Sequence, residues 1–219
     1  MRRAALGLIV LGFLWRTPAA AEAPGTAIIH GPPLLPAVQV ARQTAERLNA
    51  AQVESSALRR VAEARAAVLV ATQGTAPPAL AAVVAEEAVR AGVDPLMLAA
   101  IAELESRWDP AARGTSGELG LMQIQPATAR GVARAQGWPL PADADLLQPR
   151  TNARLAAAYL VHLRELFPGD SAAVLTAYNR GPSGAREYRQ RNGHYRSEYA
   201  AAVLGLQAAM ERRIRCGNC

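Results

Sequence analysis

Apolar residues recur every three to four positions along most of the chain, and Pro and Gly interrupt this pattern at intervals. Such spacing is typical of amphipathic helices, and the alternation expected of strands does not stand out. The fold class that we expect is therefore mainly α. The predicted helical stretches are residues 37–72, 79–91, 95–105, a helix that begins at Pro126, 152–166, 171–178 and 197–213.

The first 21 residues have the pattern of a secretory signal peptide. Arg2 and Arg3 form a charged start, residues 4–15 are an apolar run too short to span a bilayer comfortably, and small residues precede position 22. We expect cleavage near Ala21, export to the periplasm and no membrane span in the mature chain. An uncleaved membrane anchor is the alternative that this pattern leaves open.

The remaining chain divides by composition into four parts. Residues 22–36 contain four prolines and two glycines and are expected to form an extended leader. Residues 37–72 follow as a helical extension, either one long helix or a helical pair, which docks a partner or, as we favour, packs on the domain. Residues 73–78 are expected to be a linker, 79–213 the main domain, and 214–219 a tail.

One carboxylate lies on the apolar face of the helix that Asp94 and Pro95 open. At about 100° per residue, Glu105 shares a face with Leu98 and Ile101, whereas Glu103 lies roughly 160° away from Glu105. A carboxylate on an apolar face tends to be paired or to stay protonated with a raised pKa, and a protonated carboxylic acid can act as a general acid. A purely structural glutamate is the alternative.

A glycine-spaced loop runs from this helix to the next. Gly114, Gly117 and Gly120 permit tight turns and close approach of a ligand. Gln123 follows, with an amide that can donate and accept hydrogen bonds, as sugar hydroxyls and amides require. Pro126 then opens the next helix.

The chain contains three ordered blocks of residues: Glu105-Ser106, then Gly120-Leu121-Met122-Gln123-Ile124 with Pro126 and Thr128-Ala129, and Ala177-Tyr178-Asn179-Arg180-Gly181. Together they resemble the signature of the soluble lytic transglycosylase domain, a lysozyme-like fold that cleaves peptidoglycan. The resemblance covers about residues 79–206. Two features depart from the family pattern: Gly114 stands where the family often has a serine, and a glutamate often found near Tyr195 is missing.

The resemblance implies a mechanism and a set of site residues. Glu105 would protonate the β-1,4 bond between N-acetylmuramic acid and N-acetylglucosamine and then deprotonate the muramic acid 6-hydroxyl, giving a 1,6-anhydro end without a cofactor. The expected substrate-binding residues are Ser106, Gly120, Met122, Gln123, Gln125, Tyr178 and Asn179. Tyr178 would lie near the acid's oxygen, and Asn179 would contact an N-acetyl group. Tyr159 is interpreted as a core residue.

Two alternatives to this function remain open. One is a hydrolytic muramidase of the same fold, in which Glu118 or another acid activates water. The other is a non-catalytic wall-binding or assembly protein, in which residues 22–72 recruit a partner from an envelope or secretion apparatus.

The net charge, the histidines and the cysteines limit the kinds of partner and cofactor that we expect. The net charge is +6, and all 24 basic residues are arginine. This balance favours an anionic partner, and because no nucleic-acid motif occurs we expect the wall polymer. His30, His162 and His194 are too scattered for a metal site. Cys216 and Cys219 are expected to form a disulfide in an exported protein.

Overall fold

The computed structural model describes residues 36–216, and the expected signal peptide, the leader up to residue 35 and Cys219 lie outside the described residues. The elements are α1 (Pro36–Thr72), α2 (Pro78–Ala91), α3 (Pro95–Ser106), α4 (Pro126–Ala135), the 3-10 helix η1 (Asp143–Leu147), α5 (Pro149–Leu166), α6 (Ser171–Asn192) and α7 (Glu198–Cys216). Extended pairing in this part of the chain is limited to the isolated bridges of Leu119 with Arg113 and Ile124. The mainly α prediction is confirmed.

The chain forms two compact units that divide within α1, after Arg47. The described part of the first unit is residues 36–47, and its side chains from Val38 onward are exposed. Residues 37–72 belong to one helix rather than a pair. Across residues 36–216 we find no helix with the length and apolarity needed to cross a bilayer.

The second unit includes the last turns of α1 in its core. Ala64, Val68 and Ala71 are buried in the same cluster as the inner side chains of α2 and α3. Within the stretch expected to be a linker, Ala76 is buried and the other residues are exposed, and α2 begins at Pro78. The C-terminal turns of α1 thus contribute to the core of this unit, and the division of the chain into an extension, a linker and a domain stays a prediction.

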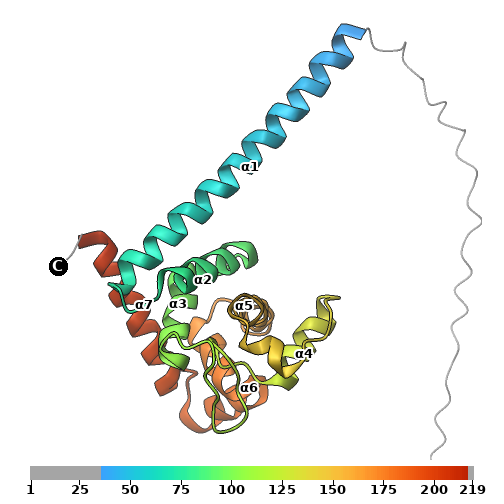
Figure 1. Ribbon diagram of the computed structural model, residues 1–219. Helices are drawn as coiled ribbons and strands as arrows, with labels where there is room; N and C mark the ends of the chain where they lie inside the picture. The colour runs from blue at the N-terminus through green and yellow to red at the C-terminus, as the bar shows by residue number, and fades with distance from the viewer. Residues whose placement is uncertain (1–35, 217–219) are drawn as a thin grey trace, which may run out of the picture. The chain divides into compact units, whose positions relative to one another are not determined.

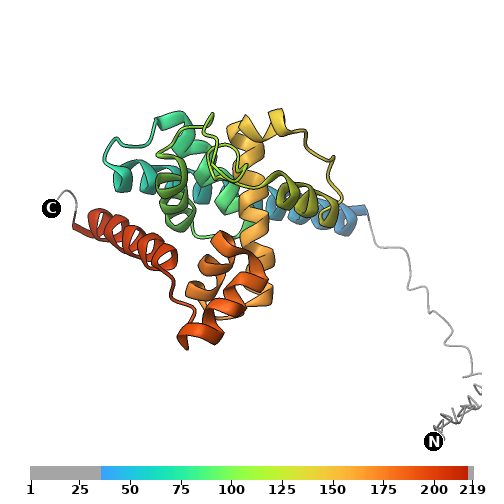
Figure 2. The same cartoon turned by 90° about the horizontal axis from the view of Figure 1, so that it is seen from below.

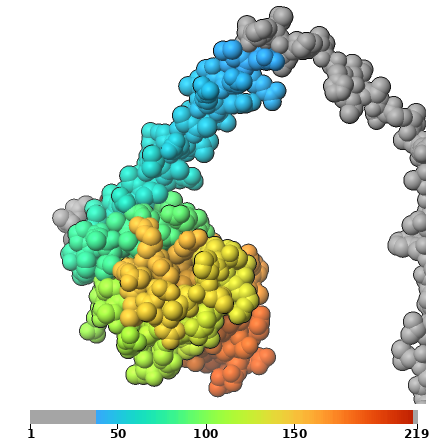
Figure 3. Space-filling view, turned by 45° about the vertical axis from the view of Figure 1, so that its right-hand side comes forward, coloured from blue at the N-terminus to red at the C-terminus, as the bar shows by residue number. Residues whose placement is uncertain are grey.

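Helix α5 organises the rest of this unit by packing against α2, α4 and α6. Helix α3 packs against α2 and α7, and α6 also packs against α7 (Figures 1 and 2). In the space-filling view, the loop before α4 and α4 itself, yellow-green to yellow, adjoin α5 in light orange (Figure 3). Segments that are distant in sequence thus meet around α5.

Helix α3 has clear start and stop signals in its sequence. The Asp94 side chain accepts hydrogen bonds from the N–H groups of Leu96 and Met97, which caps the helix. The helix ends where Arg107 and Trp108 both adopt positive φ angles, 52° and 68°. Such backbone is costly for non-glycine residues, so the surroundings must hold it. The buried Trp108 does so by donating from Nε1 to the Glu103 carboxylate at 2.5 Å.

Helix α6 is interrupted in the third signature block. Gly181 has φ 72° and ψ 162°, which breaks the helical path between Arg180 and Pro182. The first half ends where the sequence predicted, and the second half continues to Asn192. The break leaves Tyr178 and Asn179 at the end of the first half.

Candidate active site

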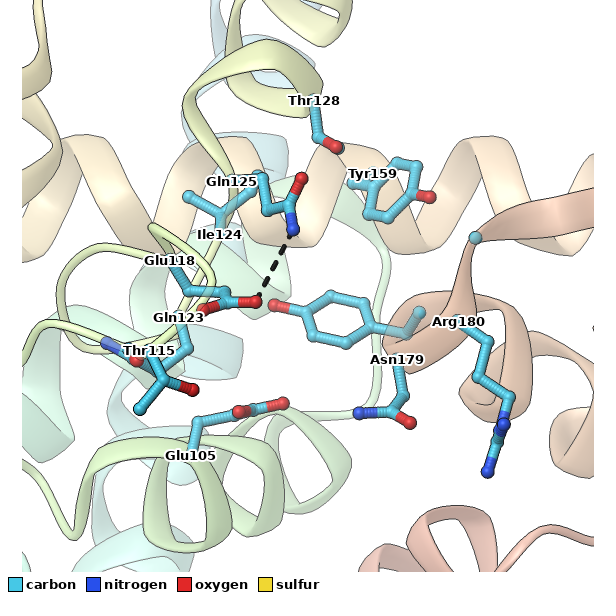
Figure 4. A pocket seen from close by; sticks show the side chains of 13 residues that line it. Glu105, Thr115, Glu118, Gln123, Ile124, Gln125, Thr128, Tyr159, Asn179 and Arg180 are labelled. Carbon is cyan, nitrogen blue, oxygen red and sulfur yellow. Dashed lines mark hydrogen bonds between the residues drawn. The ribbon is translucent and has the colours of Figure 1, made fainter. Parts of the chain in front are cut away.

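Glu105 lies at a cavity of about 390 Å³ formed by α3, the loop before α4, α5 and α6. The lining is mostly polar and comprises Glu105, Gly114, Thr115, Glu118, Gln123, Ile124, Gln125, Thr128, Tyr159, Tyr178, Asn179, Arg180 and Gly181 (Figure 4). Glu105 is half-buried, one residue before the end of α3. A half-buried carboxyl group therefore faces a space of ligand size.

Among residues 36–216, the Glu105 carboxyl group has one side-chain hydrogen-bond partner. The Tyr199 hydroxyl, from α7, donates a hydrogen bond of 2.6 Å to its Oε1. Burial raises the pKa of Glu105, the Tyr199 hydrogen bond acts in the opposite direction, and the negative charge of Glu118 adds to the rise. The net shift is upward, which favours a protonated acid at higher pH than usual.

Glu118 also lines the cavity, on the same side as Glu105, and its pKa is shifted in the opposite direction (Figure 4). The hydrogen bond from its own backbone N–H is the largest cause and lowers its pKa, burial is the next and raises it, and hydrogen bonds from Gln125 and the Ser116 N–H lower it further, so the net shift is downward. The cavity thus holds two carboxyl groups, and Glu118 is the more readily ionised.

The loop is tied to the end of α3 by Ser106. Its hydroxyl donates to the Leu121 carbonyl oxygen at 2.7 Å and to the Ala102 carbonyl oxygen at 3.2 Å. This bond fixes the Gly120–Ile124 segment beside Glu105. Ser106 does not line the cavity, so its observed contacts are structural.

Gly120 and the buried Asn152 hold the other side of the loop. Asn152 donates from Nδ2 to the carbonyl oxygens of Leu119 and Leu146 and accepts the Met122 N–H at 2.7 Å. Gly120 has φ 77°, and a Cβ there would lie 2.2 Å from the Leu146 carbonyl oxygen and 2.6 Å from Asn152 Nδ2. Glycine is needed at this position for both its backbone angle and its lack of a side chain.

Met122 and Gln123 point in different directions from this loop. The Met122 side chain is fully buried in the core, whereas Gln123 lines the cavity. The Gln123 Nε2 group donates to the Ala112 and Gly120 carbonyl oxygens at 3.1 and 2.8 Å. Gln123 has a positive φ of 46°, so its orientation is set by backbone and side chain together.

Three tyrosines line up beside Glu105. The rings of Tyr178 and Tyr199 stack with centroids 6.4 Å apart, and Tyr159 lies 5.8 Å from Tyr178. The Tyr178 hydroxyl donates to the Met122 carbonyl oxygen at 2.8 Å. Burial and the nearby Glu105 raise the pKa of Tyr178 and Tyr199 well above the usual value, so both remain hydrogen-bond donors.

The cavity includes five of the expected site residues, namely Glu105, Gln123, Gln125, Tyr178 and Asn179. The cavity is not lined by Ser106, Gly120 or Met122, whose contacts instead position the loop that forms its wall. Sequence reasoning missed Tyr199 and assigned Tyr159 to the core, although Tyr159 is half-buried and lines the cavity. It also missed Thr115, Thr128 and Arg180 as lining residues. Neither tyrosine had a local pattern that pointed to the site.

Residues 36–216 contain no cluster of three His, Cys, Asp or Glu side chains that could hold a metal ion. The expected disulfide involves Cys219, which is not described, so it stays a prediction.

The helical fold and a polar cavity that holds the half-buried carboxyl group of Glu105 define a class of domain, which comparisons with known proteins identify. The model of the transglycosylase SLT domain matches residues 82–200. The chain belongs to this family.

Relatives and solved structures agree with this assignment. The chain is 34% identical over 90 residues to the soluble lytic murein transglycosylase of Escherichia coli K12, which covers 41% of this chain and 14% of that protein. It is 44% identical over 71 residues to the endo-type membrane-bound lytic murein transglycosylase A of Klebsiella pneumoniae, covering 32% and 35%. The fold is also similar to an X-ray structure of the Pseudomonas aeruginosa lytic transglycosylase Slt, an inactive mutant with glutamine in place of one glutamate. The TM-score is 0.55 at 28% identity, and the match covers 61% of this chain and 24% of that one. The chain thus spans about a third or less of these proteins' lengths.

Proposed function

We propose that this protein is a peptidoglycan lytic transglycosylase with Glu105 as its catalytic acid and base. The observation that carries the proposal is the half-buried Glu105 carboxyl group, held by Tyr199 at a polar cavity in an SLT domain. The relatives named above are lytic murein transglycosylases, and the inactive Pseudomonas mutant carries a glutamate-to-glutamine change. Both points support the proposal.

The first step is proton donation. Protonated Glu105 donates to the glycosidic oxygen between N-acetylmuramic acid and N-acetylglucosamine as the bond from that oxygen to C1 breaks. Positive charge develops on the muramic acid ring, and the N-acetyl group of the substrate can assist. The raised pKa of Glu105 suits this step because the acid form persists to higher pH.

The second step closes a ring without water. Ionised Glu105, stabilised by Tyr199, removes the proton from the muramic acid 6-hydroxyl, and that oxygen bonds to C1. The product carries a 1,6-anhydro end, and Glu105 is protonated again. A glycosidase usually needs two carboxylates, but here the nucleophile comes from the sugar, so one is sufficient.

The alternative reaction is hydrolysis with Glu118 as the second carboxylate. Glu118 lines the cavity, and its lowered pKa favours the ionised form that could activate water. The mass of the released fragments separates the reactions, because hydrolysis adds one water per cleavage and transglycosylation adds none.

The test is release of soluble fragments from purified peptidoglycan, analysed by mass. Glu105→Gln cannot transfer a proton and should lower the rate by about 10²–10⁴-fold. Glu103→Gln is the matched control on the same helix and should change the rate by less than about 10-fold. The enzyme would be a muramidase if the wild type released fragments whose mass includes the added water and the Glu118→Gln variant were inactive. A fully active Glu105→Gln variant would rule out the assigned acid.

We also propose that the protein acts in the periplasm after export. Its substrate lies outside the inner membrane, and the first 21 residues have the pattern of a signal peptide. The exported protein should begin near Glu22, as N-terminal sequencing would detect. A periplasmic product that retains Met1 would contradict cleavage.

Residues 22–72 are the proposed contact for an envelope or secretion-apparatus protein. Several apolar side chains of α1 are exposed, among them Val53 and Leu58. A crosslinking reaction in intact cells, with a photoreactive residue at position 53 or 58, should trap a specific envelope protein. If no adduct forms, the extension serves the domain alone.

A further inference from the structure

The charge in the cavity is distributed unevenly. Among the lining residues, Glu105 and Glu118 lie at one side, and Arg180 lies at the other, beyond Asn179 (Figure 4). Arg180 is the one cationic side chain among the cavity-lining residues within 36–216. A substrate with a negative group is therefore oriented with that group toward Arg180 and away from the two carboxyl groups.

Arg180 is held in place without a carboxylate partner. Its guanidinium lies over the Tyr188 ring at 5.2 Å and makes no hydrogen bond or ion pair to any residue between 36 and 216. Tyr188 is in turn fixed by its hydroxyl, which donates to the Arg196 carbonyl oxygen at 3.3 Å. A stacked guanidinium keeps its planar set of N–H donors available for two-point binding of a carboxylate.

The backbone around Arg180 supports the same role. A Cβ at Gly184 would lie 3.0 Å from the Arg180 Cβ, so glycine at this position leaves room for the base of the arginine side chain. The second half of α6 begins at Pro182, and the N-terminal end of a helix carries partial positive charge. Gly181, which lines the cavity, adjoins this end. Both sources of positive potential therefore lie at one edge of the cavity.

We propose that Arg180 binds a carboxylate group of the substrate strand at this edge of the cavity. The proposal rests on the proposed function, because it assigns the anionic group to peptidoglycan. Two sources share this chemistry: the acidic groups of the peptide stem, and the lactyl carboxylate that muramic acid exposes once its peptide has been removed. Arg180 thus determines specificity for strands that carry carboxylates over neutral glycans.

Binding measurements in the Glu105→Gln background test this without turnover. The ligands are soluble strands with peptides, strands stripped of peptides by an amidase, and neutral chitin oligomers. Arg180→Gln should weaken binding of at least one anionic ligand by about 5–10-fold and leave the chitin oligomers unaffected. Arg180→Lys should restore part of the affinity because it keeps the charge. Whichever anionic ligand is weakened identifies the source of the carboxylate.

Arg189→Gln is the matched control. Arg189 is exposed on the same helix and lies 5.1 Å over the Tyr195 ring, but it does not line the cavity. It should leave all affinities unchanged. The proposal would be overturned if Arg180→Gln weakened the binding of chitin oligomers equally or had no effect on any affinity. It would also be overturned if Arg189→Gln weakened binding as much as Arg180→Gln.

Turnover by the otherwise wild-type enzyme gives a second readout. Arg180→Gln should raise KM for the anionic strands and change kcat by less than about 2-fold, because the contact is remote from the reacting atoms. If the wild type releases no fragments but binding still depends on Arg180, the proposed function fails and this inference stands. If the wild type cleaves and Arg180→Gln has the same KM, the inference fails and the function stands.

Discussion

The hydroxyl of Tyr199 lies 2.6 Å from Oε1 of Glu105, although 94 residues separate the two in the sequence. A hydroxyl donor stabilises the ionised form of a carboxyl group more than the protonated form, so this contact opposes the effect of burial. The pair thus sets how far the pKa of Glu105 rises.

Replacing Tyr199 with Phe should move the alkaline limb of the pH–rate profile to higher pH. The variant loses the donor that favours ionised Glu105, so the pKa of Glu105 rises further and the acid form persists longer. The rate of fragment release, measured over a range of pH, would show the shift. Tyr195→Phe is the control, because the Tyr195 hydroxyl makes no contact with Glu105 among the described residues, and it should not shift the profile. A limb that stays in place or moves to lower pH in Tyr199→Phe would contradict the assignment.

The Glu105→Gln variant should be more stable than the wild type, and the difference should grow as the pH rises above 4.5. The pKa of Glu105 is higher in the folded state than its usual 4.5, so the unfolded state releases the proton first and the wild type loses stability between pH 4.5 and the folded pKa. The neutral amide has no such loss. Urea unfolding should therefore give variant and wild-type free energies whose difference grows in favour of the variant above pH 4.5. A difference that shrinks with pH would show that the folded pKa is not raised.

Glu103→Ala should instead destabilise the protein at neutral pH. Glu103 accepts hydrogen bonds from Trp108 Nε1 and from the Thr75 hydroxyl, and its removal leaves the buried Trp108 N–H without that acceptor. A loss of about 1–3 kcal/mol is expected from urea unfolding at pH 7. An unchanged free energy of unfolding would show that this contact does not hold the end of α3.

Gly120→Ala should destabilise the loop more than a matched change in a helix. The new Cβ would clash with the Leu146 carbonyl oxygen and Asn152, and the positive φ angle adds strain. A cost of about 2 kcal/mol or more is expected in urea unfolding, together with reduced fragment release. A Cβ added at Gly131 in α4 would have no neighbour within 4 Å, so Gly131→Ala should be neutral or stabilising by up to about 1 kcal/mol. Equal stability of the two variants would show that the loop can relax around a side chain.

The sequence predicted the helices well because their start and stop signals are local. Asp94 caps α3, and Gly181 breaks α6, as expected from residue type alone. The helical phase also placed Glu105 correctly at the edge of the domain interior.

The contacts that complete the site could not be predicted in this way. Tyr199 reaches Glu105 only because α7 packs on α3, and nothing near Tyr199 in the sequence indicates that packing. Tyr159 has the spacing of a core residue, and its partial exposure depends on the cavity formed by the loop before α4. Glu103 is on a different face from Glu105, as expected, but a tryptophan and a threonine bind it.

The hydrogen bonds of Gln123 give its amide a fixed polarity toward the substrate. Both hydrogen bonds of Nε2 go to carbonyl oxygens of its own loop, whereas Oε1 accepts no hydrogen bond from residues 36–216. The Gln123 amide, which could donate or accept hydrogen bonds, therefore has only its acceptor oxygen left for a ligand. At this position the cavity therefore presents a hydrogen-bond acceptor, which suits a hydroxyl or an N–H group rather than a carbonyl oxygen.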